Sequence, residues 1–258
     1  MLLACDIGNS DITLGLFQDG KWKYVWRIPS IVDRPELFYG IKIRDIFFEV
    51  GITVGDIQKI VISSVVPDLT DKIINVTVTL FQKNPVVLGP EIYPRLPIQV
   101  LNPYEIGSDL VANAVAAYTL FKRSNIVVDF GTALTFTTLS DEGKILGVAI
   151  APGLKTAIKS LSQNTAKLFD VPLEMPSSAL GKGTSHAIQA GILLGYEGLV
   201  QSIISKIKFE MKDENLPVIA TGGLSSVIKT LLPLYSIIEP NLTLEGLRIV
   251  AIQEGRQS

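Results

Sequence analysis

The stretch LLACDIGNS, residues 2–10, decides the fold because NIVVDFGTA, residues 125–133, repeats its pattern. In both stretches an apolar run leads to an aspartate, Asp6 or Asp129, and a glycine follows two residues later. An acidic-glycine pair follows each aspartate at the same distance, Asp19-Gly20 in one half and Glu142-Gly143 in the other. Such pairs are typical of hairpin turns between strands. We therefore predict that the chain carries the same acidic loop and hairpin twice.

This repeat predicts two lobes, residues 1–115 and residues 116–258, and the chain length allows both. In the first lobe we expect strands at LLACDI, ITLGLF, WKYVWRI, KIVISSVV and PVVLG, with helices near 35–50 and after Pro67. In the second lobe we expect strands at NIVVDF, ALTFTTL, ILGVAIA and PVIAT, with helices from Gly153, over 184–211 and over 243–253. Trp22 and Trp26 are expected on one face of their strand. Hairpins followed by alternating helices and strands predict an α/β fold with a mixed sheet in each lobe.

Composition excludes several classes of protein. A formal net charge of −2 gives no electrostatic reason to expect nucleic acid. The one cysteine, Cys5, excludes an intrachain disulfide, and the one histidine, His186, excludes a multi-histidine metal site. No apolar run reaches the length of a membrane helix, and MLLACDIG does not resemble a signal peptide. We expect a cytoplasmic protein with no membrane or nucleic-acid partner.

The two acidic loops predict phosphate chemistry. A carboxylate at a strand end can hold a hydrated cation, and a glycine nearby lets backbone amides approach phosphate oxygens. A lone D-x-G would be explained better by an aspartate that satisfies local amides. Because the motif and its hairpin occur twice, we favour a polyphosphate and a cation held by both lobes.

Two further motifs have both a structural and a functional interpretation. Thr221-Gly222-Gly223 follows an apolar strand and precedes an expected helix near Leu224, so it is a simple turn or a site of close nucleotide approach. Gly107-Ser108-Asp109 begins the small-residue helix LVANAVAAY, so Asp109 is a helix cap or a base for an acceptor hydroxyl.

Taken together, DIGNS, GSD with NAVAA, DFGTA, APG, GKGT and TGG resemble the type III pantothenate kinases, in order and spacing and over nearly the whole chain. The resemblance implies two ribonuclease H-like lobes of the actin-like ATPase superfamily, which also includes acetate kinase, sugar kinases and Hsp70. It implies ATP-dependent phosphorylation of pantothenate, the first step of coenzyme A synthesis. It also implies Mg²⁺, a monovalent cation (K⁺ or NH₄⁺), and a homodimer with the pantothenate site near the subunit interface.

The same resemblance implies roles for individual residues. Asp109 is the expected proton acceptor, Asp129 the ligand of the monovalent cation, and Asp6 a position for Mg²⁺. The expected ATP-binding residues are Asp6, Ile7, Gly8, Asn9, Ser10, Asp11, Ile12, Thr13 and Thr132. The expected pantothenate-binding residues are Gly107, Ser108, Asp109, Leu110 and Thr184.

The sequence departs from the family pattern around the acceptor. Leu110 stands where the family has an arginine, Val100 where it has a tyrosine, and Gly147-Val148 where it has two glycines. Loss of an arginine that pairs with a carboxylate removes about 1.5–3 kcal/mol of binding energy. Three hypotheses therefore stay open: a pantothenate kinase, a non-catalytic nucleotide-binding relative that regulates a partner, and a kinase for a less anionic alcohol.

Overall fold

The structure is a computed structural model that describes residues 1–165 and 167–255. Its contacts divide the chain into two compact units, one of Met1–Thr119 with Leu242–Ser258 and one of Leu120–Asn241. This division differs from the expected lobes, 1–115 and 116–258, in the last helix, α7 (Leu242–Glu254). Helix α7 belongs to the first unit because it packs on strands β1 and β4.

The first unit contains a five-stranded mixed sheet in the order β3-β2-β1-β4-β5. Its strands are β1 (Leu2–Ile7), β2 (Asp11–Gln18), β3 (Lys21–Pro29), β4 (Lys59–Ser64) and β5 (Val86–Val87). Strands β1 to β3 form two antiparallel hairpins, whereas β4 runs parallel to both β1 and β5. The mixed sheet predicted from the sequence is confirmed.

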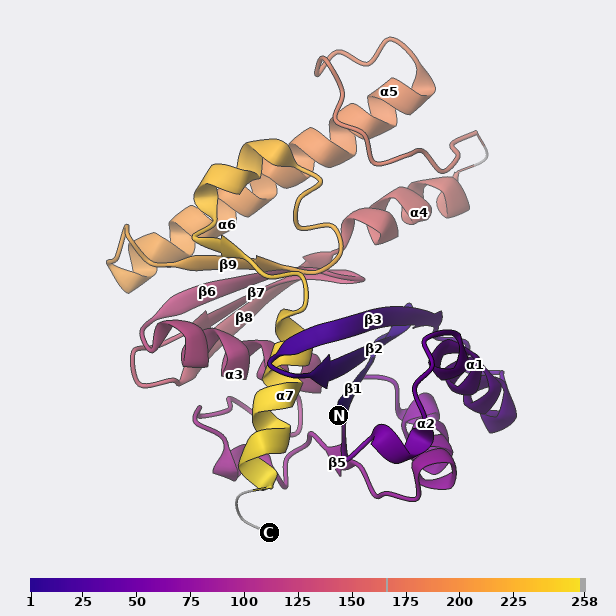
Figure 1. Ribbon diagram of the computed structural model, residues 1–258. Coiled ribbons are helices and arrows are strands. Elements are labelled where there is room, and N and C mark those ends of the chain that lie inside the picture. The colour runs from indigo at the N-terminus through magenta and orange to yellow at the C-terminus, as the bar shows by residue number, and fades with distance from the viewer. Residues whose placement is uncertain (166, 256–258) are drawn as a thin grey trace. The chain divides into compact units, whose positions relative to one another are not determined.

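Helices cover both faces of this sheet. Leu3, Cys5 and Ile7 alternate along β1 and are buried against α1 (Glu36–Glu49) and α2 (Pro67–Phe81), which lie side by side (Figure 1). The opposite face receives α7, where a side chain at Gly15 would meet Leu244 at 2.7 Å. Helix α7 also crosses α3 (Ser108–Phe121), with Gly246 against the backbone of Ala112, so the absence of a side chain at Gly246 permits the crossing.

A β-bulge corrects the prediction for the tryptophans. Tyr24 and Trp26 stack with ring centroids 5.1 Å apart, and Trp26 packs against the α1–α2 core. The pairing of β2 with β3 shifts between Leu16 and Phe17, which leaves Lys23 as the extra residue. Trp22 therefore lies on the other face, beside Gly15, and the expectation that both tryptophans share one face is wrong.

The second unit contains another five-stranded mixed sheet, in the order β10-β9-β6-β7-β8. Its strands are β6 (Asn125–Phe130), β7 (Ala133–Leu139), β8 (Ile145–Pro152), β9 (Val218–Thr221) and β10 (Ile237–Ile238). Its helices are α4 (Leu154–Asn164), α5 (Thr184–Gln189) and α6 (Gly195–Met211). Ile126, Val128 and Phe130 of β6 pack against α6, so the core lies on one face of β6.

The two hairpins share their position but differ in their turns. Asp19 (φ 50°) and Gly20 (φ 80°) both adopt left-handed conformations, as the tight type I′ turn requires. In the second hairpin only Gly143 (φ 77°) does so, inside a turn from Ser140 to Lys144 that is followed by a shift of register. The repeat is therefore real in topology, and the second turn is longer.

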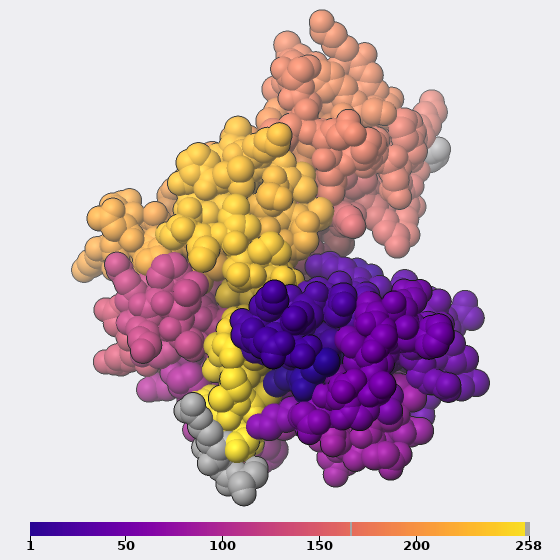
Figure 2. Space-filling view, in the orientation of Figure 1, coloured from indigo at the N-terminus to yellow at the C-terminus, as the bar shows by residue number. Residues whose placement is uncertain are grey.

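Two helix predictions need revision. The helix expected near Leu224 is instead a run of turns followed by the 3₁₀ helix η4 (Lys229–Leu234), and the segment after β9 lies at the surface of the second unit (Figure 2). The helix expected over 184–211 is continuous but contains a π-helical segment, η3 (Ala190–Leu194), between α5 and α6. By length and hydropathy alone this helix could cross a membrane, which is weak evidence because its inner face joins the core of the second unit.

Candidate active site

The first acidic loop joins β1 to β2. The amide of Gly8 donates to the carbonyl of Asp11 at 3.0 Å, which closes the loop around Asn9 and Ser10. From outside the loop, the Ser30 hydroxyl donates to the Gly8 carbonyl at 2.6 Å. The loop is thus fixed at its base, while the side chains of Asn9 and Ser10 are exposed.

The predicted ATP-binding stretch divides into two groups by burial. Ile7 and Ile12 are buried in the α1–α2 core, so only their backbones are available to a ligand. Asp6 lies on the other face of β1, directly opposite Thr13 of β2 and Ser63 of β4. Residues opposite each other in neighbouring strands bring their side chains together on one face of a sheet. We call Thr13, Asp6 and Ser63 the first row.

Helix α3 begins beside this row. The Ser108 hydroxyl lies 2.8 Å from the Ser63 hydroxyl, accepts from the Ser64 amide and donates to the Ser64 carbonyl, both at 3.0 Å. Ser63 and Ser108 are both buried. These bonds tie the first turn of α3 to the end of β4, and the Ser108 side chain is directed to β4.

Asp109 is the second residue of α3. Its Oδ1 accepts from the amide of Leu110 at 2.8 Å and lies where a side chain at residue 107 would be, so a larger residue at Gly107 would displace the Asp109 carboxylate. Burial raises the pKa of the Asp109 carboxyl above its usual range, against the lowering effect of the backbone amides that bind it. A carboxyl with a raised pKa is a stronger base than a solvated aspartate, as abstraction of a hydroxyl proton requires.

Leu110 and Tyr93 bring an apolar and an aromatic side chain to the region of Asp109. Leu110, which replaces the expected arginine, is 8% exposed, so its side chain is buried. Tyr93 of the 3₁₀ helix η2 (Tyr93–Arg95) is also buried, and burial together with the negative Asp109 raises its pKa to about 12. Tyr93 therefore stays protonated and can donate a hydrogen bond at neutral pH.

The second acidic loop joins β6 to β7. Asp129 lies directly opposite Thr135 of β7 and Thr221 of β9, and we call Thr135, Asp129 and Thr221 the second row. Gly222 follows Thr221 with φ 86°, and a side chain there would lie 2.6 Å from Asp129 Oδ1. The DFG and TGG motifs are therefore neighbours in the structure, and Gly222 leaves the space that the Asp129 carboxylate occupies.

Thr132 is exposed at the tip of this loop. Its carbonyl accepts from the Gly153 amide at 2.9 Å and from the Thr156 hydroxyl at 2.7 Å. Gly153 precedes α4, and a side chain there would collide with the carbonyls of Gly131 and Thr132. The glycine of the APG motif therefore packs against the second acidic loop and binds its Thr132 carbonyl.

The GKGT segment forms the start of α5. Thr184 is the first residue of this helix and is exposed on the single chain. Gly181 packs against the backbone of Ala187, where no side chain would fit. The Nε2 of His186 donates to the Ser178 carbonyl at 2.9 Å, so the one histidine holds this loop to its helix.

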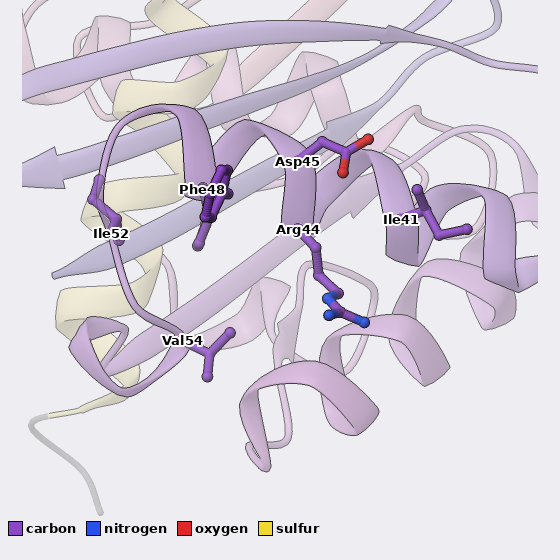
Figure 3. Close-up of a pocket in the computed structure, with 7 residues that line it drawn as sticks. Ile41, Arg44, Asp45, Phe48, Ile52 and Val54 are labelled. Carbon is purple, nitrogen blue, oxygen red and sulfur yellow. The ribbon is translucent and has the colours of Figure 1, made fainter.

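A hollow of about 460 Å³ lies elsewhere on the first unit, at the carboxyl end of α1 (Figure 3). Its lining residues are Ile41, Arg44, Asp45, Phe47, Phe48, Ile52 and Val54. None of them belongs to the acidic loops or to α3. The hollow is therefore separate from the motifs that carry the chemistry.

Three site residues were not singled out from the sequence. Ser63 and Thr156 bind Ser108 and the Thr132 carbonyl, and Thr135 is the strand neighbour of Asp129, but nothing in their own segments marks these hydroxyl residues out. Ser63 and Thr135 could have been found by taking the strand neighbour of each aspartate. That requires the register, which the sequence alone does not supply.

Comparison with known proteins assigns the family. The family model described as type III pantothenate kinase matches residues 2–206. A type III pantothenate kinase of Geobacter sulfurreducens is 42% identical over 250 residues, which cover 97% of this chain and 98% of the relative. A type III pantothenate kinase of Syntrophobacter fumaroxidans is 41% identical over 251 residues, with 97% of each chain covered.

Solved structures agree on the fold. The Arthrobacter inorganic polyphosphate/ATP-glucomannokinase superposes with a TM-score of 0.53 at 16% identity, covering 100% of this chain and 99% of that one. MreB5 of Spiroplasma citri, solved with ADP, gives 0.55 at 10% identity, covering 100% and 98%. The fold is thus the two-lobed α/β fold of the actin-like ATPases and sugar kinases. By its sequence match over nearly the whole chain, this protein belongs to the type III pantothenate kinase family.

Proposed function

We propose that this protein transfers the γ-phosphoryl group of ATP to the hydroxyl of pantothenate, giving 4′-phosphopantothenate, the first intermediate of coenzyme A synthesis. The observation that carries the proposal is Asp109, whose carboxylate is held over Gly107 at the start of α3 with a raised pKa. The family supports the substrate, since the curated relatives are type III pantothenate kinases.

In this proposal Asp109 accepts the proton of the attacking hydroxyl. The hydroxyl oxygen forms a bond to the γ-phosphorus as the bond from that phosphorus to the ADP oxygen breaks, and the proton moves to Oδ of Asp109. Little covalent chemistry is asked of the protein, so positioning and charge neutralisation supply most of the rate. Two features fix the position of Asp109: the hydrogen bonds from Ser108 to β4, and the absence of a side chain at Gly107, which leaves room for the carboxylate.

The two acidic loops would hold the phosphates and ions. Each row offers carboxylate and hydroxyl oxygens, the donors that hard cations prefer, so the residues fit Mg²⁺ at Asp6 and a monovalent cation at Asp129. When bound, these cations would neutralise phosphate charge. The stretch Asp6 to Thr13 and the exposed Thr132 would contact ATP, with Gly8 and Gly131 allowing close backbone approach.

The remaining parts of the proposal follow the family. Thr184, exposed at the start of α5, would contact pantothenate near the subunit interface of a homodimer. Gly107, Ser108 and Leu110 would line the acceptor with Asp109, Ser108 through its backbone. We propose a cytoplasmic enzyme, in keeping with these soluble substrates.

A coupled assay of ADP release with pantothenate, ATP, Mg²⁺ and K⁺ tests the proposal. Asp109→Asn should lower kcat by about 100-fold or more, since general-base catalysis contributes about 10²–10⁴-fold, while nucleotide binding is retained. Asp68→Asn is the matched control, because Asp68 is also the second residue of its helix but is exposed. Wild-type turnover absent at saturating pantothenate, or unchanged in Asp109→Asn, would refute the proposal.

Leu110 favours a second candidate, a kinase of the same mechanism for a less anionic alcohol. A buried leucine beside the base offers no hydrogen bond to a carboxylate. A panel of acceptors separates the two: preference for a neutral amide analogue of pantothenate over pantothenate itself would support this candidate, and the reverse preference would reject it. Ligand-induced stabilisation with no phosphate transfer to any acceptor would indicate a non-catalytic relative instead.

A further inference from the structure

Thr135 carries a buried hydroxyl that the fold leaves unsatisfied. The residue is 8% exposed, and its Oγ1 has no hydrogen-bond partner among the residues that the structure describes. Leaving a buried hydroxyl unpaired costs about 1–3 kcal/mol, so such groups are rare and call for an explanation. A ligand that binds this oxygen would provide one.

The position of Thr135 shows which ligand the oxygen would meet. Thr135 lies directly opposite Asp129, with Thr221 on the far side of the same aspartate. Leu134 and Phe136 point into the core of the second unit, so Thr135 shares the opposite face of the sheet with Asp129. Directly opposite residues of antiparallel strands have Cβ atoms about 4.5–5.5 Å apart, which leaves room for one ion between their oxygens.

The charge and the space at this point favour a cation. An anion such as phosphate would be repelled by Asp129. No group of three or more histidine, cysteine, aspartate or glutamate side chains lies together in the described parts of the chain, so one carboxylate serves the site. The choice of a monovalent ion follows the proposed function, because the Asp6 row also contains a single carboxylate. Gly222 keeps the space beside Asp129 Oδ1 clear of any side chain.

We propose that the Thr135 hydroxyl is a direct ligand of the monovalent cation, together with the Asp129 carboxylate. The inference rests on the proposed function only in that it takes Asp129 as the cation site. It adds a residue from β7 and explains why a buried strand contains a threonine whose hydroxyl has no other partner in the described parts of the chain. The cation then holds β6 and β7 together at their loop.

The test compares four variants by thermal unfolding without nucleotide or pantothenate, titrated with KCl against choline chloride at constant ionic strength. Thr135→Val removes the hydroxyl and keeps the shape, and Thr135→Ser keeps the hydroxyl. Thr137→Val is the matched control, since Thr137 is buried two residues further along the same face of β7. Asp129→Asn removes the charge of the site.

We expect Thr135→Val to raise the K⁺ concentration for half-maximal stabilisation by about tenfold or more, the lower end of what a lost metal-site contact costs. Thr135→Ser and Thr137→Val should respond as the wild type does. Without K⁺, Thr135→Val should melt no lower than the wild type, because the unpaired hydroxyl is gone. A structural role for the hydroxyl predicts the opposite, a lower melting temperature at every K⁺ concentration.

Two K⁺ responses would overturn the inference, and only the second would also reject the proposed cation site at Asp129. If Thr135→Val keeps the wild-type K⁺ response while Asp129→Asn loses it, Thr135 is not a ligand and the proposed cation site at Asp129 stands. If Asp129→Asn also keeps the response, both the inference and the cation site of the proposed function are wrong. The kinase proposal is judged separately, by the turnover of the Asp109 variants.

Discussion

Substitution of Gly222 by alanine tests whether the two motifs of the second unit form one site. At φ 86° a non-glycine residue costs about 1–3 kcal/mol. The new Cβ would lie 2.6 Å from Asp129 Oδ1 and 2.7 Å from the carbonyl carbon of Phe130, and such overpacking costs about 1–3 kcal/mol more. Together these predict a loss of about 2–6 kcal/mol in the free energy of unfolding, and a melting temperature lower by at least about 4 °C.

The same substitution should displace the Asp129 carboxylate. Relief of the contact requires a shift of several tenths of an ångström, and a misplacement of about 1 Å can lower a rate by about 100-fold. We therefore expect a weaker K⁺ response in thermal unfolding and in ADP release. Gly198→Ala is the control, because Gly198 lies in α6 with nothing within 4 Å, and alanine there should stabilise by about 0.5–1 kcal/mol. A Gly222→Ala protein with the melting temperature and K⁺ response of the wild type would refute the reasoning.

Three further predictions concern the first unit. Ser108→Ala removes the bonds to Ser63 and Ser64, so it should cost about 1–3 kcal/mol by urea unfolding and lower kcat more than it raises KM, while Ser108→Thr should recover part of both. The raised pKa of Asp109 predicts that activity appears only as the pH rises through that pKa, above the usual range of an aspartate, in a pH profile of kcat/KM. A carboxyl with a raised pKa loses its stabilising contribution as the pH rises through the folded-state pKa. Asp109→Asn should therefore melt at a higher temperature than the wild type at pH 7, and a lower melting temperature would contradict burial of the charge. Burial, with a smaller effect of Asp6, raises the pKa of the Cys5 thiol to about 12, so a thiol reagent at pH 8 should label the protein only when it is unfolded, and rapid labelling of the native protein would exclude this burial.

The sequence predicted the strands well because their signals are local. Alternating or continuous apolar runs bounded by acidic-glycine turns predicted both hairpins, and the strands end at Ile7 and Phe130, one residue beyond Asp6 and Asp129. The parallel neighbours β4 and β9 were also found, since each is a short apolar run. The motif residues were placed correctly on these elements for the same reason.

The remaining features depend on contacts that local patterns do not encode. The bulge at Lys23, which moves Trp22 to the other face, follows from the pairing of two strands. The packing of α7 on the first sheet depends on Gly15 and its crossing with α3 on Gly246, and both roles appear only when the helix is in place. The segment after Gly222 was predicted as a helix from its apolar residues, although it forms turns and a 3₁₀ helix.

The two rows repeat one arrangement of residues. Each aspartate lies between two hydroxyl residues of neighbouring strands: Asp6 between Thr13 and Ser63, and Asp129 between Thr135 and Thr221.

The hydroxyls differ in what they bind. In the first row Ser63 is paired with Ser108, so its hydrogen bond is used to position the helix that carries Asp109. In the second row Thr135 has no such partner among the described residues, and its oxygen remains available for a ligand. If the row pattern were a structural requirement of the sheet alone, both hydroxyls should be satisfied within the protein. Of these two hydroxyls, only that of Thr135 is unsatisfied among the described residues, which agrees with the cation site proposed at Asp129.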